Sequence, residues 1–478
     1  MAVCIKLGFV PSYRFRWSPW AERMRQGTLD AMARLPGVKV VVPEPCGDGP
    51  IGEGRTRHGA VQSLDEAECV AEWFAREGVD GLVLCPLDFG DERSACIVAE
   101  RLGVPVFLYA TEEPVALTDA SLARVSDSYC GNLSMASGLH RRGVEFRFGG
   151  IFMPGDPELH RELDAFIRAV AVVKGLRNAR VGQIGVRPAS FETVAYDEVA
   201  LVRKFGQTIV PANLEDIVAD AMARPADDPR VCATMDALRG SVRHCTVADD
   251  YVLNAARLEL AMLDFAERYR LVALAAQCWP SIQRMMGISV CALFGRLTER
   301  GLLTACEVDV LGALSMLVNR QAALHETVPH FIDWTIRHRE DPNRLLAWHC
   351  GNAPVCLARS EDETALRSRN NMTGEAPISP GDTQAGLYQF QLRPGPVTIC
   401  RLAEHDGRWR MLVTRGEIVP SDDVLAGTWA WVAVPDHARL YRTLVEEGFI
   451  HHASMIHGDQ VDALLLACRF LDIEPVVV

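Results

Sequence analysis

Two carboxylates and a pair of histidines lie within apolar segments of this sequence. Glu307 opens an amphipathic stretch, EVDVLGALSM, Asp333 lies in PHFIDWTIRH, and His451 and His452 lie in GFIHHASMIHGD. A carboxylate among apolar residues is costly to bury unless a cation or hydrogen-bond donors meet it. Carboxylate oxygens with one or two imidazoles suit a divalent cation such as Mn²⁺. Such a site favours chemistry on a carbonyl next to a hydroxyl, because the cation can polarise both oxygens.

Each of these residues also has an ordinary structural explanation. Glu307 could be an acidic residue in the first turn of a helix, where it favours the helix dipole. Adjacent residues on a strand point to opposite faces, so only one of His451 and His452 would normally reach a shared site, with His457 in reserve. His349, in LLAWHCGN, has two interpretations: a ligand, or the commoner core histidine that hydrogen-bonds a backbone carbonyl.

Length and composition restrict the class of protein. A chain of 478 residues predicts two or three domains. With 49% hydrophobic and 23% charged residues, it has the composition of a globular protein with a sizeable core. The net charge of −13, without a basic stretch that carries aromatics, argues against nucleic-acid binding.

The cysteines and the N-terminus indicate the compartment. The 15 cysteines are scattered and form no CxxC pair, so we expect reduced thiols instead of a disulfide scaffold or a structural zinc site. The segment MAVCIKLGFV has no signal-peptide pattern. No apolar run reaches the roughly 18 residues that a membrane span needs. We therefore expect a cytoplasmic protein without membrane association.

The elements that must position these residues change in character along the chain. In the first two thirds, short apolar runs alternate with amphipathic segments, which is typical of parallel sheets with crossover helices. Gly and Pro cluster at residues 147–158 and indicate a boundary. After residue 328, short β-branched runs broken by Gly, Pro and Asp indicate an antiparallel, barrel-like unit.

These patterns predict an α/β fold class with two tandem three-layer α/β domains followed by a β-barrel-like domain. The predicted domains are residues 1–150, 151–327 and 328–478. Ligands bind at the carboxyl ends of strands in parallel sheets, which makes loops of the first domain candidate binding loops. They are the loops after Val10, Pro43, Pro86 and Ala110.

Several segments in the same order resemble the L-fucose isomerase and L-arabinose isomerase superfamily. The likeness runs from Gln277 to the C-terminus, and FVPSYRFRWSPWAERM resembles the family's opening strand and substrate loop. The resemblance implies two α/β domains followed by a β-barrel-like domain, which agrees with the pattern above. It rests on QCWPSIQ, ACEVDVLGALSM, FIDWT, PGPVTICRL, RGEIV and GFIHHASMIHGD.

The resemblance implies a ketol isomerase that uses Mn²⁺, with Co²⁺ or Mg²⁺ as substitutes. Carried over by motif, Glu307 and Asp333 would be acidic metal ligands and the acid/base pair, and His452 would be the imidazole ligand. His349 matches a further ligand of arabinose isomerase-like members. The fucose isomerase branch has an asparagine where this chain has His451, so the sequence mixes features of two branches and leaves the sugar open.

The implied chemistry fits these residue types. Aldose–ketose isomerisation moves a proton between C1 and C2 through an enediol. A divalent ion that bridges O1 and O2 polarises the carbonyl and acidifies the neighbouring hydroxyl. Carboxylates on opposite faces of the sugar can then move the proton between carbons or oxygens, and which of them is the base stays open.

The substrate loop is expected to contribute arginines. Arg14 and Arg16 follow the first predicted strand, where an ordinary solvated loop is the alternative interpretation. The resemblance implies that one of them bonds sugar hydroxyls, from a neighbouring subunit. Arginine also binds anions bidentately, so a sulfonated or phosphorylated sugar is among the expected substrates, beside a deoxy sugar or a pentose. Further candidates for substrate contact are Gln277, Trp279, His451 and Trp429, the last with a buried aromatic as the alternative.

The prediction is therefore a metal-dependent aldose–ketose isomerase that acts on a monosaccharide. The alternatives are a metal-dependent epimerase or aldolase, which would use the same enediolate, and a non-catalytic sugar-binding protein, which has no need of acidic ligands inside apolar segments. The resemblance also implies a homo-oligomer, trimer to hexamer, with active sites near subunit interfaces.

Overall fold

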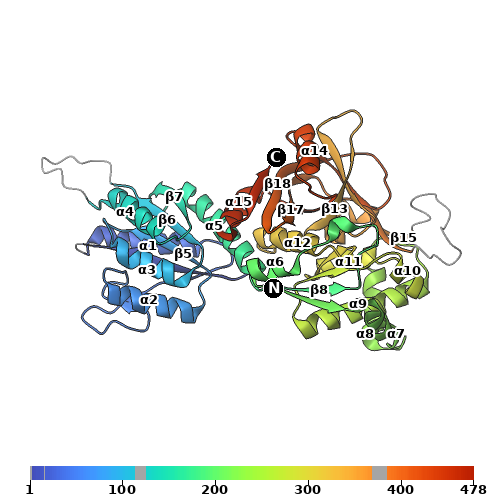
Figure 1. Cartoon of the computed structure of the whole chain (residues 1–478), viewed down its shortest axis with the longest axis horizontal. Coiled ribbons are helices and arrows are strands. Elements are labelled where there is room, and N and C mark those ends of the chain that lie inside the picture. Colours follow the sequence, from blue (N-terminus) through green and yellow to red (C-terminus); the bar gives the residue numbers. More distant parts are fainter. Residues whose placement is uncertain (1–2, 15–16, 114–124, 369–384) are drawn as a thin grey trace. The chain divides into compact units, whose positions relative to one another are not determined.

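The computed structural model describes residues 3–14, 17–113, 125–368 and 385–478, and it forms two compact units (Figure 1). The first unit comprises Met1–Lys174 with Asp462–Asp472, and the second comprises Gly175–Val461 with Ile473–Val478. Contacts thus join most of the predicted central and C-terminal domains into one unit, so the division into three domains stays a prediction. No helix within the described ranges is long and apolar enough to cross a membrane.

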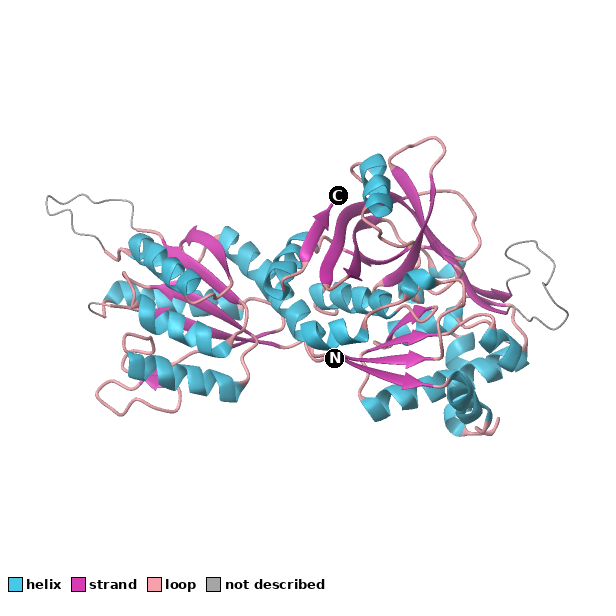
Figure 2. Ribbon diagram, viewed as in Figure 1, coloured by secondary structure: helices cyan, strands magenta, loops and turns pink. Residues whose placement is uncertain are grey.

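The first unit contains a five-stranded parallel sheet with helices packed on it (Figure 2). Every residue of its two central strands, GLVLCP and VFLYAT, is buried, as expected for a parallel sheet that is covered on both faces. The strand order is β2 (Val38–Val41), β1 (Ile5–Ser12), β5 (Gly81–Pro86), β6 (Val106–Thr111) and β7 (Phe146–Phe152). A short pair, β3 (Glu44–Pro45) and β4 (Arg55–Thr56), completes the strands of this unit.

Local signals in the sequence start and stop the helices of the first unit. The Ser63 side chain accepts a hydrogen bond from the Glu66 N–H at the start of one helix, and Gly78 ends that helix with a left-handed φ of 65°. The helices are α1 (Pro19–Ala33), α2 (Leu64–Glu77), α3 (Glu92–Leu102), α4 (Ser128–Arg141), α5 (Pro157–Leu176, through Lys174) and α15 (Val461–Leu471).

The second unit contains a smaller parallel sheet and most of the remaining helices. The sheet has four strands, ordered β12 (Leu303–Cys306), β11 (Ala273–Ala276), β8 (Arg180–Ile184) and β9 (Thr208–Ala212). Its helices are α6 (Glu198–Phe205), α7 (Leu214–Met222), α8 (Pro229–Arg239), α9 (Asp249–Tyr269), α10 (Ser281–Met286), α11 (Cys291–Glu299) and α12 (Val310–Ala322), with the short helix η1 (Glu192–Val194).

A mixed sheet of ten strands occupies the rest of the second unit. Antiparallel pairings form a closed circuit through β19, β14, β13, β20, β17 and β18 and back to β19. In Figure 1, α12 lies beside the curved strands of this circuit. The strand order is β10 (His244–Cys245), β15 (Ala365–Ser368), β16 (Ala385–Gln391), β19 (Thr428–Ala433), β14 (Arg344–His349), β13 (His330–Arg337), β20 (His452–His457), β17 (Gly395–His405), β18 (Arg408–Val419) and β21 (Glu474–Val477). The short helices η2 (Val355–Leu357) and η3 (Glu361–Glu363) and the helix α14 (His437–Glu446) connect its strands.

The predicted α/β class, with parallel sheets followed by a further large sheet, is thus confirmed, and the circuit of antiparallel pairings is compatible with the predicted barrel. Residues 147–158, predicted as a boundary, contain most of β7 and the start of α5, and this boundary stays a prediction. One local expectation is wrong. Glu307 does not lie in the first turn of a helix, because β12 ends at Cys306 and α12 begins only at Val310. All 15 cysteines are free thiols, as expected.

Candidate active site in the second unit

The pairing of two strands brings Asp333 and His452 together. Strands β13 and β20 are antiparallel, and Asp333 lies directly opposite His452 in their register. Residues at opposite positions of an antiparallel pair project from the same face of the sheet. The Nε2 atom of His452 accordingly lies 3.7 Å from the Asp333 Oδ1 atom.

Glu307 reaches the same histidine from the parallel sheet. It follows β12, and its Oε2 atom lies 2.9 Å from the His452 Nε2 atom. Both Glu307 and Val308 have a left-handed backbone, with φ values of 62° and 61°. Such a conformation costs on the order of 1–3 kcal/mol for each non-glycine residue and is found mainly at functional sites. The sharp turn after β12 therefore carries the carboxylate of Glu307 to His452.

A tryptophan holds the other oxygen of Glu307. The Nε1–H group of Trp279 donates a hydrogen bond of 2.8 Å to Glu307 Oε1. Phe191, beside η1, packs edge-on against the Trp279 ring at 5.8 Å and against the His451 ring at 5.6 Å. Trp279 and His452 thus contact the two oxygens of the Glu307 carboxylate, and Phe191 packs on the Trp279 ring.

Both histidines of the pair reach Glu307. The ligand atoms of Glu307, His451 and His452 lie within 4.8 Å of one another. The alternation argument, by which only one of the two histidines would reach the site, fails because His451 precedes β20 and is not part of the strand. His451 is exposed, whereas His452 is only 1% exposed. His457 donates a hydrogen bond of 2.9 Å from Nε2 to the Arg393 carbonyl and remains a structural histidine.

His349 is buried beside Phe331 and hydrogen-bonds to the neighbouring backbone. Its Nδ1 atom accepts a hydrogen bond of 2.9 Å from the Cys350 backbone N–H. A neutral imidazole that accepts at Nδ1 carries its proton on Nε2, so Nε2 is a donor in this tautomer. With this hydrogen bond Nε2 is a donor, and the role of His349 as a metal ligand, which the resemblance implies, stays a prediction.

The electrostatics of the site centre on His452. Burial lowers the pKa of this histidine, but hydrogen bonds to Asp309 and Glu307 and the charges of Asp309 and Asp333 raise it to about 9. Burial raises the pKa of Glu307, and the hydrogen bond and charge of His452 outweigh it, so this pKa lies below its usual value. Three carboxylates therefore surround one imidazole.

The donor set fits a divalent cation. The Oδ1 atom of Asp333 is buried and has no hydrogen-bond partner within the part of the chain that the structure describes. An unpartnered carboxylate oxygen is unfavourable in a protein interior unless a cation meets it. Beside it lie the carboxylate of Glu307 and the imidazole of His452, which are the ligand types expected for Mn²⁺.

Two of the predicted substrate contacts bond or pack within the protein. Gln277 accepts a hydrogen bond from the Val186 N–H and donates one to Ser281 Oγ, so its amide joins two loops. Trp429 is only 2% exposed and packs with Leu346 and Trp431. The buried-aromatic alternative is therefore favoured for Trp429, because a stacking platform needs an accessible face.

The predicted arginines belong to the first unit. Arg14 follows β1, lies over the Phe89 ring at 4.2 Å and forms an ion pair of 3.5 Å with Glu92. Its loop lies at the carboxyl end of the parallel sheet, where a ligand loop was expected. Arg16 lies outside the described residues. The substrate contacts of both arginines stay predictions.

Sequence reasoning missed two residues of the site. Phe191 lies far from the other site residues in the chain, and no pattern around it marks a function. Asp309 is fully buried and accepts a hydrogen bond of 2.9 Å from His452 Nδ1. Its position two residues after Glu307, within the same apolar segment, was a signal that could have identified it.

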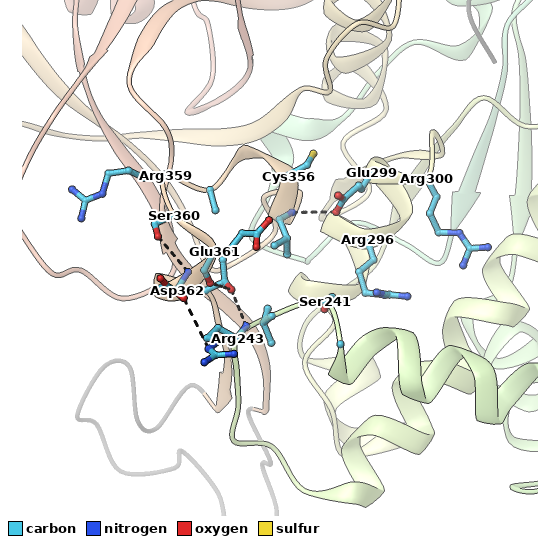
Figure 3. Close-up of a pocket in the computed structure, with 15 residues that line it drawn as sticks. Ser241, Arg243, Arg296, Glu299, Arg300, Cys356, Arg359, Ser360, Glu361 and Asp362 are labelled. Carbon is cyan, nitrogen blue, oxygen red and sulfur yellow. Dashed lines mark hydrogen bonds and ion pairs between the residues drawn. The ribbon is translucent and has the colours of Figure 1, made fainter.

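A separate cleft of about 770 Å³ lies in the same unit (Figure 3). None of the predicted site residues is among the described residues that line it. Its arginines are paired: Arg296 and Arg300 contact Glu259, and Arg359 contacts Glu363. This cleft therefore does not mark the chemistry of the protein.

Replacing Trp279 with phenylalanine removes the N–H donor to Glu307 but keeps an aromatic ring at that position, so metal binding should weaken. We expect Trp279→Phe to lower Mn²⁺ affinity and turnover on the order of 10- to 100-fold, because a hydrogen bond to a charged group contributes about 1.5–3 kcal/mol. Trp431→Phe is the matched control, since Trp431 Nε1 donates to Asp423 Oδ2 at 2.7 Å. Titration of both variants with Mn²⁺ and initial rates on sugar would check this, and equal losses in both variants would contradict it.

Comparison with known proteins identifies the family. Residues 49–177 match the family model "Fucose/sulfoquinovose isomerase, N-terminal domain", and residues 347–477 match "L-fucose isomerase, C-terminal domain". The chain belongs to the fucose isomerase-like superfamily, as the sequence resemblance predicted, and is an isomerase of that superfamily.

Individual relatives show which branches are similar. The chain is 27% identical over 384 residues to a sulfoquinovose isomerase from Alkalicoccus urumqiensis, covering 80% of this chain and 82% of that protein. It is 25% identical over 419 residues to a sulfoquinovose isomerase from Priestia aryabhattai, covering 87% and 89%. An L-arabinose isomerase from Klebsiella pneumoniae subsp. pneumoniae is 22% identical over 337 residues, covering 68% and 65%.

Proposed function

We propose that this isomerase interconverts an aldose and a ketose through an enediol and depends on a divalent metal ion held by Glu307, Asp333 and His452. The observation that carries the proposal is the buried Oδ1 atom of Asp333 beside Glu307 and His452, which has no hydrogen-bond partner among the residues that the structure describes. Mn²⁺ is the proposed ion, because mixed carboxylate and imidazole ligands suit it. His451, whose ring lies 4.1 Å from that of His452, would be a further ligand or a substrate contact.

When bound, the ion would polarise the carbonyl oxygen and the neighbouring hydroxyl of the sugar. The chain's own residues do the proton transfer. One carboxylate of the Glu307–Asp333 pair would take the proton from carbon, and the proton would return to the adjacent carbon, while the proton of the neighbouring hydroxyl would move to the former carbonyl oxygen. The hydrogen bond from Trp279 orients Glu307 for this task. Trp279 and Phe191 would exclude water from one side.

The relatives suggest the sugar. The matches named sulfoquinovose isomerase have higher identity and coverage than those named L-arabinose isomerase. We therefore propose the sulfonated aldose sulfoquinovose as the first substrate to test, and L-arabinose as the second. An anionic sugar also agrees with the prediction of an arginine in the substrate loop.

The remaining predictions about partners belong to this proposal. We propose that a monosaccharide is the ligand and that the chain forms a homo-oligomer, as the sequence resemblance implies. Sedimentation velocity of the metal-loaded protein would test the assembly, and a monomer at micromolar concentration would contradict it.

The test of the function is a panel of sugars given to EDTA-treated enzyme with and without Mn²⁺. The panel contains sulfoquinovose, L-arabinose, L-fucose and a phosphorylated hexose, and NMR detects the product. We expect ketose from sulfoquinovose only when Mn²⁺ is present. Ketose from L-arabinose alone would support the second sugar. An epimer or cleaved product would favour the epimerase or aldolase alternative, and Mn²⁺-independent ketose would contradict the metal dependence.

A further inference from the structure

Asp309 has a hydrogen-bonding environment that the proposed chemistry does not yet explain. It is fully buried and lies at the start of α12, where its Oδ1 atom accepts a hydrogen bond of 2.8 Å from the Gly312 N–H. The buried Arg401, on β17, donates to both oxygens at 2.5 and 3.0 Å. His452 Nδ1 contacts Oδ2 at 2.9 Å. The carboxylate thus receives two partners on each oxygen.

Burying the Asp309–Arg401 ion pair costs free energy, and packing alone does not explain why the pair is there. Taking two charges out of water is unfavourable, and apolar residues of similar volume often stabilise a core as well or better. Gly312 makes room for this carboxylate, since a Cβ atom there would lie 2.5 Å from Asp309 Oδ2. The pair holds one carboxylate in one orientation, with one lone pair directed at His452.

The orientation decides which nitrogen of His452 faces the site. An ionised carboxylate that is paired with arginine can only accept hydrogen bonds, so the Nδ1 atom of His452 must donate. Nε2 then points to Glu307 at 2.9 Å and to Asp333 at 3.7 Å. Carboxylates that bond the second nitrogen of a ligand histidine fix its tautomer and ring orientation in other metal sites.

We propose that Asp309, held by Arg401, is a positioning residue that fixes the tautomer and orientation of His452 for metal binding. This inference rests on the proposed function, because it assigns His452 to the metal. Both oxygens of Asp309 are occupied by Gly312, Arg401 and His452, so Asp309 would act through His452 and not by touching substrate or ion. In the Asp309→Asn variant the amide can donate to Nδ1, which moves the imidazole proton to Nε2 and removes the ligand atom.

The experiment measures Mn²⁺ affinity from the EPR signal of free Mn²⁺, together with steady-state kinetics. For Asp309→Asn we expect the Mn²⁺ dissociation constant to rise on the order of 10- to 100-fold. At saturating Mn²⁺, kcat should fall while the KM for the sugar changes by less than about twofold, because uniform sugar binding is untouched. Wild-type Mn²⁺ affinity and kcat in a folded Asp309→Asn protein would overturn the proposal.

A matched control separates positioning from folding. Glu259 is a second fully buried carboxylate, and it pairs with Arg296 at 2.8 Å and with Arg300 at 2.7 Å. Glu259→Gln should lower the melting temperature and leave Mn²⁺ affinity unchanged. If Asp309→Asn does not fold, Arg401→Lys tests the positioning role of Asp309 in its place, because lysine cannot bind the carboxylate bidentately. Weaker Mn²⁺ binding by Arg401→Lys is expected, and wild-type affinity would overturn the proposal.

The two proposals fail in different ways. If the wild-type protein binds Mn²⁺ but forms no ketose from any sugar, the proposed function fails, and the Mn²⁺ affinities of the variants still decide the role of Asp309. If the wild-type protein binds no Mn²⁺, both proposals fail.

Discussion

Glu307→Gln will abolish measurable ketose formation and weaken Mn²⁺ retention while the fold stays intact. Glutamine keeps the volume of the side chain but removes the charge that binds the ion and the base that moves the proton. Loss of a general acid or base lowers rates by roughly 10²- to 10⁴-fold, and loss of the ligand adds to this. Initial rates and Mn²⁺ content after gel filtration measure both effects.

A control for Glu307→Gln comes from the cleft in Figure 3. Glu299 lines that cleft and accepts a hydrogen bond from the Val355 N–H. Glu299→Gln should keep wild-type turnover and Mn²⁺ content. A Glu307→Gln enzyme with full activity and a full complement of metal would remove Glu307 from the site.

Asp333→Asn will lower the activity of the enzyme without lowering the stability of the metal-free protein. The Oδ1 atom of Asp333 is buried and has no hydrogen-bond partner among the described residues, so a neutral amide in its place breaks no hydrogen bond at that atom. We expect turnover to fall by roughly 10²- to 10⁴-fold, because the residue is an acid/base candidate. The melting temperature of the metal-free variant should not fall.

Calorimetry with and without Mn²⁺ checks this expectation. Added Mn²⁺ should raise the melting temperature of the wild-type protein by mass action and raise that of Asp333→Asn less. Asp341→Asn is a suitable control, because Asp341 pairs with Arg344 at 2.8 Å near the surface. A metal-free Asp333→Asn protein that melts well below the wild type, with normal Mn²⁺ stabilisation, would show that Asp333 serves the fold.

Residues of the site could be predicted from the sequence where a charged side chain lies among apolar residues. Asp333 lies among Phe331, Ile332 and Trp334, where a carboxylate is costly unless a cation or hydrogen-bond donors meet it. The register of β13 and β20 places His452 opposite it. The parallel sheets followed from alternating apolar and amphipathic segments, because each buried strand must be covered by helices.

Other features depend on contacts that no local pattern contains. The tautomer of His349 is set by the backbone N–H of Cys350, and that of His452 by Asp309, held by Arg401 from a distant strand. The left-handed backbone at Glu307 replaces the predicted first helical turn, because the carboxylate must reach His452 directly after β12. Burial of Trp429 follows from the pairing of β14 with β19.

The most direct test of the metal-dependent isomerase is a titration of metal-free wild-type enzyme with Mn²⁺ in the presence of sulfoquinovose. Ketose formation and bound Mn²⁺ are measured in the same samples. The account predicts no ketose without metal and a rate that rises in proportion to bound Mn²⁺ until each chain holds one ion at Glu307, Asp333 and His452. A rate that does not change as Mn²⁺ binds would contradict it.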